Sequence, residues 1–172
     1  MACALTTGFA LDTDCKGAHG GVRSLRIVEH SNVEEITTSA AGVVTAITMV
    51  ASKKFFLYLF KKEVASIKET ENTDEENETV EYIQEFSTKF NRLSSIKRAE
   101  LALVAKNVTI AIAEDNNGKF WLLGEKFGLT KSGSRETGTK FADFNGSMLT
   151  FKGKELDPFK EIDATIVDAI TA

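Results

Sequence analysis

The chain has 172 residues, of which 42% are hydrophobic and 27% charged, and its formal net charge is −4. This composition is typical of a globular protein and predicts one domain, residues 1–172, with a single sizeable core. Twelve Phe and a single Pro argue against a disordered chain and against a loop-rich disulfide scaffold. The segment 69–81 contains seven acidic residues and no basic one. The rest of the chain has no general excess of basic residues of the kind that binds nucleic acid.

Residues 1–20 mix Thr, Gly, Asp and Ala without a sustained period, which predicts an extended N-terminal arm rather than core. The apolar start, residues 1–5, lacks a basic flank, so we expect no signal peptide. No run reaches the 18 apolar residues of a membrane-spanning helix, so we expect no membrane insertion and a reducing, cytosolic setting.

Alternating residues predict a short strand over 22–29, and β-branched apolar residues predict a buried strand over 43–50. Between them, residues 32–42 are ambiguous, with Asn32 a possible helix cap.

A long strand is predicted over 78–90, because apolar and charged residues alternate there with a period of two. The aromatic run that begins at Phe55 is the expected partner, giving a long protruding β-hairpin over about 55–90. A hairpin that projects beyond the core usually meets another subunit. The residues expected at that interface are Phe55, Phe56, Tyr58, Phe60, Val80, Tyr82 and Phe86.

The tip of this hairpin is expected to be an acidic loop. Its acids are Glu69, Glu71, Asp74, Glu75, Glu76 and Glu78. Calcium binding has little support, because the loop lacks the pattern of an EF-hand. Two readings stay open: a solvated tip, or a surface that docks on a basic patch of a neighbouring copy. The bases suggested for that patch are Lys53, Lys54, Lys61, Lys62 and Lys68.

A change of period to three or four predicts one α-helix over about 94–106, capped by Ser94 or Ser95. Its apolar stripe, expected to lie across a sheet, is Ile96, Ala99, Leu103 and Val104. The next two segments, 108–113 and 119–127, flank an Asn-Gly pair and predict a hairpin with both faces covered, one by the helix and one by another sheet or subunit.

The chain then predicts a mobile loop over 131–138 and strands around a turn at Asn145-Gly146. A C-terminal tail, 157–172, is expected to begin a helix at Asp157-Pro158, with a strand as the alternative. Together these patterns predict an α+β, mainly β fold: an antiparallel two-sheet sandwich or open barrel with one flanking helix.

Residue types that carry chemistry are few. Four residues are of the types that bind metal ions, but their spacing is poor for a zinc site: Cys3, Cys15, His19 and His30. The sequence leaves open whether the two cysteines form a disulfide. Both histidines lie outside any catalytic motif, and the glycines of 17–21 lack the Lys-Ser/Thr ending of a phosphate loop. We therefore expect no enzyme activity, no catalytic residues, no metal and no cofactor.

Three stretches resemble small structural proteins of tailed bacteriophages, most closely the tail tube proteins of phages that infect Bacteroidetes. They are the opening MACALTTGF (1–9), the hairpin DNNGKFWLLG (115–124) and DFNGSMLTFKGKE (143–155). The similarity covers most of the chain and consists of turn-and-strand patterns.

This resemblance implies a virion protein of the tail, assembled in the host cytoplasm into stacked, hexameric rings through which DNA is ejected. In such an assembly the acidic loop would lie between rings or face the lumen. The implied partners are further copies of the chain, other tail proteins, and duplex DNA that passes without specific binding. A head decoration protein or a head-to-tail connector is the alternative. A less favoured one is a module that binds a small ligand between helix 94–106 and the sheet.

Overall fold

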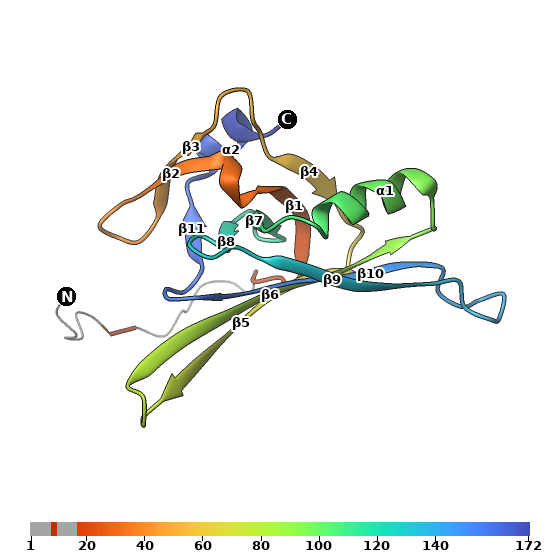
Figure 1. Cartoon of the computed structure of the whole chain (residues 1–172). Helices are drawn as coiled ribbons and strands as arrows, with labels where there is room; N and C mark the ends of the chain where they lie inside the picture. The colour runs from red at the N-terminus through yellow and green to blue at the C-terminus, as the bar shows by residue number, and fades with distance from the viewer. Residues whose placement is uncertain (1–7, 10–16) are drawn as a thin grey trace.

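The computed structural model describes residues 8–9 and 17–172, which form two stacked β-sheets with two helices (Figure 1). The larger sheet has the order β2-β3-β11-β8-β7-β1-β4. Its strands are β1 (Val22–Glu29), β2 (Val33–Thr38), β3 (Val44–Met49), β4 (Phe56–Leu59), β7 (Thr109–Asp115), β8 (Phe120–Leu123) and β11 (Lys160–Ile162). A short 3-10 helix, His30–Asn32, joins β1 to β2.

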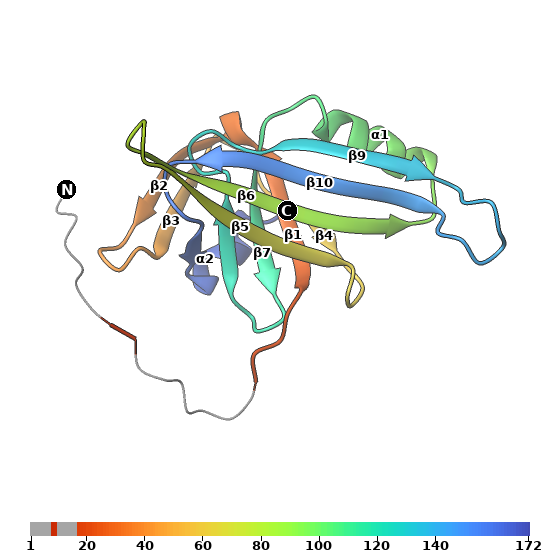
Figure 2. The same ribbon diagram turned by 90° about the horizontal axis from the view of Figure 1, so that it is seen from below.

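The smaller sheet is fully antiparallel, with the order β5-β6-β10-β9 (Figure 2). Its strands are β5 (Ala65–Asp74), β6 (Thr79–Asn91), β9 (Thr130–Glu136) and β10 (Gly146–Glu155). The predicted α+β, mainly β sandwich is therefore confirmed. The helices are α1 (Ser95–Val104), which is the predicted flanking helix, and α2 (Ala164–Ile170), which lies in the C-terminal tail.

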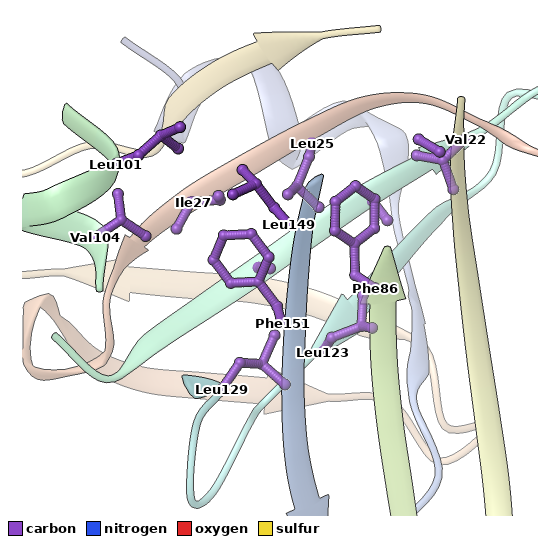
Figure 3. Packing of buried hydrophobic residues seen from close by; sticks show 13 residues of the cluster. Val22, Leu25, Ile27, Phe86, Leu101, Val104, Leu123, Leu129, Leu149 and Phe151 are labelled. Carbon is purple, nitrogen blue, oxygen red and sulfur yellow. The ribbon is translucent and has the colours of Figure 1, made fainter. Parts of the chain in front are cut away.

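The main core lies between the two sheets, where apolar residues at alternate positions of β1, β6 and β10 face one another. Phe86 of β6 and Phe151 of β10 pack with their ring centroids 6.0 Å apart. Figure 3 shows both rings directed at Leu25 and Ile27 of β1. Burying such side chains contributes about 1.5–3 kcal/mol each, so this contact fixes the smaller sheet on the larger one.

A second core covers the other face of the larger sheet. Ile110, Ile112 and Leu122 point there and meet Val167 of α2 and the fully buried Phe55. The predicted hairpin of β7 and β8 is confirmed, and so is the covering of both its faces. The covering helix is α2, whereas α1 packs at the margin of the main core through Leu101 and Val104.

The predicted hairpin over 55–90 is wrong in its first arm. Residues 56–59 form β4 and pair with β1 in the larger sheet, while the partner of β6 is β5, which begins at Ala65. The period of two in β6 is confirmed, because Gln84, Phe86 and Thr88 are buried on one face. Figure 1 shows the distal part of the β5–β6 hairpin extending beyond the other elements.

Helix α1 begins where predicted, since the Ser94 hydroxyl accepts a hydrogen bond of 3.2 Å from the Lys97 amide. The predicted apolar stripe is partly wrong. Ile96 and Leu103 are exposed, and Leu101 and Val104 are the buried positions. Because α1 lies beside the sandwich and not across a sheet, only a narrow stripe is covered.

The segment 131–138 is not a loop, because residues 130–136 form the edge strand β9 along β10. Backbone pairing makes this strand although its side chains are mostly small and polar. Asn145-Gly146 lies at the start of β10 and is not a hairpin turn.

The C-terminal tail differs from its prediction as well. Its helix is capped by Asp163, whose carboxylate accepts from the Thr165 amide at 2.9 Å. Asp157 instead pairs with Lys126 at 2.9 Å, and β11 lies between the two positions.

Candidate assembly interface

Both edges of the smaller sheet are open in the part of the chain that the structure describes. β5 pairs only with β6, and β9 pairs only with β10. The two edges lie at opposite sides of one sheet, as Figure 2 shows. Unpaired amide and carbonyl groups along such an edge are a template for a strand from another chain.

The face of this sheet that points away from the core is polar. The registers of the four strands place Ser66, Ser87, Thr150 and Ser132 in one row across it. On the same face, Lys68, Lys89, Lys152 and Lys154 balance Asp74, Glu81, Glu85 and Glu136, so these charges sum to zero. One close pair, Lys154 Nζ and Glu81 Oε2, is 2.8 Å apart. The sheet thus has one apolar face, one neutral polar face and two free edges.

The predicted interface residues of the aromatic run and long strand do not form one surface. Phe55 and Phe86 are fully buried inside the chain, so their prediction as contacts to another subunit is wrong. Tyr58 and Phe60 are half-buried and pack on the main core beside Phe90. Only Phe56 and Val80 are exposed, with 53% and 44% of their surface accessible.

Tyr82 is half-buried on β6, where it pairs with Glu71. Burial and the charges of Glu71, Glu69 and Asp157 raise the pKa of its hydroxyl. It therefore lies among carboxylates at the base of the hairpin, and a contact of Tyr82 with another subunit remains a prediction.

The predicted acidic loop also divides into two groups. Glu69 is a structural residue, because its Oε2 accepts hydrogen bonds from the Phe159 amide at 2.7 Å and from Gln84 Nε2 at 3.1 Å. Asp74 organises the turn by accepting from the Glu76 and Asn77 amides at 3.0 and 3.1 Å. These hydrogen bonds, above all those from Asn77, lower the pKa of Asp74.

The remaining four acids are exposed at or near the turn: Glu71, Glu75, Glu76 and Glu78. Their carboxylates form no ion pair within the described residues. This group is the part of the predicted acidic loop that is free to meet a neighbour.

Sequence reasoning did not bring β4 and α1 together, and their exposed apolar margin includes Phe56, Leu59 and Leu103. A hollow of about 200 Å³ lies there, lined among others by Tyr58 and Glu100. The Tyr58 hydroxyl donates to Glu100 Oε1 at 3.1 Å, and burial, followed by the charge of Glu100, raises its pKa. The hollow coincides with the small-ligand site considered from the sequence, but it is smaller than ordinary ligand pockets of roughly 300–1,000 Å³.

The residues with metal-ligand chemistry are not brought together. Among residues 8–9 and 17–172, no three His, Cys, Asp or Glu side chains are grouped to hold a metal ion. His19 binds the β7–β8 turn through Asn117, and the His30 ring contacts the Glu125 carbonyl at 3.0 Å. Cys3, Cys15 and most of the predicted arm lie outside the described residues.

Comparisons with protein-family models, curated proteins and solved structures found no match to this chain. None of the described helices is long and apolar enough to span a membrane.

Proposed function

We propose that this chain is a non-enzymatic structural protein whose copies join into rings, and that these rings stack into a hollow tube of the kind found in bacteriophage tails. The observation that carries the proposal is the smaller sheet, with its two open edges, apolar inner face and neutral polar outer face. Pairing of β5 in one copy with β9 in the next joins different edges. Such a head-to-tail contact closes into a ring when its rotation closes.

The size of such a ring suits a passage for DNA. Six copies with four strands each, spaced about 4.8 Å apart, give a circumference of roughly 115 Å and a diameter of about 37 Å. Tilting the strands, as closed barrels require, widens it further. The polar face would line the lumen, because the other face is buried on the larger sheet.

The charge of that face supports free passage of DNA. Proteins that hold DNA gain affinity by neutralising phosphates with Lys and Arg and releasing counterions. Here the lysines and the acids of the face are equal in number, and a row of Ser and Thr crosses it. Duplex DNA would slide along this wall without adhering. The other proposed partners are further tail proteins of the virion.

Electron microscopy of the purified protein at low and high concentration tests this proposal. We expect rings with an open centre at low concentration and stacked tubes at high concentration. Labelled antibody on whole virions should decorate the length of the tail. Compact monomers at every concentration, or label confined to the head or the neck, would contradict the proposal in favour of a decoration or connector protein.

A further inference from the structure

The two ends of β6 carry opposite charge. At its N-terminal end lies the acidic turn, residues 75–78, with Glu75, Glu76 and Glu78 exposed. At its C-terminal end the chain passes through Arg92 into α1. Figures 1 and 2 show the turn and the start of α1 at opposite ends of the smaller sheet. With thirteen residues, β6 separates them by about 43 Å.

A basic groove lies at the α1 end. It consists of two adjoining hollows of about 540 and 420 Å³, both of which include Lys97. Neither hollow is lined by an Asp or Glu. The basic residues that line them are Lys61, Lys89, Arg92, Lys97, Arg98 and Arg135.

These basic side chains are free to bind a partner. None of them forms an ion pair with any described residue. Lys97 donates to the Asn91 carbonyl at 2.8 Å, and that neutral acceptor leaves its charge unbalanced. The groove also has an apolar part, with Leu59 exposed over 69% of its surface. The hairpin near the acidic turn has a matching apolar residue, Val80.

We propose that the acidic turn of one copy docks in the basic groove of another copy, and that this contact stacks successive rings. The contact joins opposite ends of the molecule, so it repeats without closing on itself and builds a tube. Charge complementarity sets the direction of stacking, because turn against turn and groove against groove repel. The inference rests on the proposed function, which supplies the rings.

A charge-swap experiment tests this contact. One variant reverses the turn with Glu75→Lys, Glu76→Lys and Glu78→Lys. The other reverses the groove with Lys61→Glu, Arg92→Glu, Lys97→Glu and Arg98→Glu, which leaves four acids and two bases there. Both should fold, because the turn glutamates accept no side-chain hydrogen bond from the described residues and Lys61 and Arg92 are exposed. Acids at positions 97 and 98 would lie in the first turn of α1, where they are favourable.

Sedimentation velocity and electron microscopy should show that each variant alone forms rings but no tubes. Their equimolar mixture should form tubes again, because a basic turn then meets an acidic groove and an acidic turn meets a basic one. A control with Lys53→Glu and Lys54→Glu, both exposed and outside the groove, should assemble like the wild type.

The outcomes separate the two proposals. Tubes of wild-type length from either variant alone, or a mixture that stays as rings, would overturn the docking contact and leave the ring proposal standing. A wild-type protein that forms no rings under any condition would overturn the proposed function, and the stacking contact with it.

Discussion

Asp115 is a single carboxylate that organises the β7–β8 turn. Its Oδ1 accepts from the Asn117 and Lys119 amides at 2.8 and 2.9 Å, and its Oδ2 accepts from Trp121 Nε1 at 3.1 Å. Partial burial acts to raise the pKa of this group, but the hydrogen bonds outweigh burial and lower it. The ionised carboxylate is therefore the form that stabilises the fold.

This direction predicts how an Asp115→Asn variant compares with the wild type. Because the folded pKa is below the unfolded value of about 3.9, the wild-type advantage is complete above about pH 5. It then shrinks as the pH falls through the folded pKa. We expect a difference of about 1 kcal/mol in the free energy of unfolding at pH 7. Urea unfolding from pH 7 to pH 3 measures it, and an advantage that grows on acidification would contradict the assignment.

Other carboxylates show why single-residue roles were harder to predict. Glu155 is buried and accepts hydrogen bonds from three successive amides, those of Lys126, Phe127 and Gly128, at 3.0–3.2 Å. Glu69 reaches an amide ninety positions away, at Phe159. In the sequence both look like surface acids, because their partners come close only when the chain has folded. Asp115 differs, because the groups that donate hydrogen bonds to it follow within six residues in the sequence.

At the scale of elements, periodicity predicted correctly those strands, turns and caps that depend on residues close together in the sequence. The strand at 22–29, the hairpin of β7 and β8, and the Ser94 cap of α1 are all confirmed. The aromatic run from Phe55 was given the wrong partner, because an apolar run indicates a strand but not which strand it pairs with. β9 was missed because its pairing comes from the backbone, and its small polar side chains resemble a loop.

Gly133 is the residue that lets β9 lie against β10. A Cβ atom there would come within 2.3 Å of the Met148 carbonyl oxygen and 3.0 Å of Leu149 Cδ2. We expect Gly133→Ala to lower the free energy of unfolding by about 1–3 kcal/mol, as overpacking does. The exposed neighbour Ser134→Ala is the matched control and should change it by less than about 0.5 kcal/mol. Equal stability of the two variants in urea would contradict this close approach.

At the scale of the molecule, the two sheets have different roles. The centre of the larger sheet is covered on both faces, by the smaller sheet and by α2. Among the described residues, no other strand pairs with either edge of the smaller sheet, and its longest strand separates an acidic turn from a basic groove. The sequence suggested self-assembly and an acidic tip. It could not locate the groove, because Lys61, Lys97 and Arg135 meet only in the fold.

The account predicts that rings close by pairing of β5 with β9. Hydrogen–deuterium exchange of monomeric and assembled protein tests this most directly, with β2 and β4, the edge strands of the larger sheet, as internal controls. In rings that have not stacked, amides of residues 65–74 and 130–136 should become protected, while those of 33–38 and 56–59 should exchange as in the monomer. Protection of β2 or β4 with unchanged exchange in β5 and β9 would contradict the account.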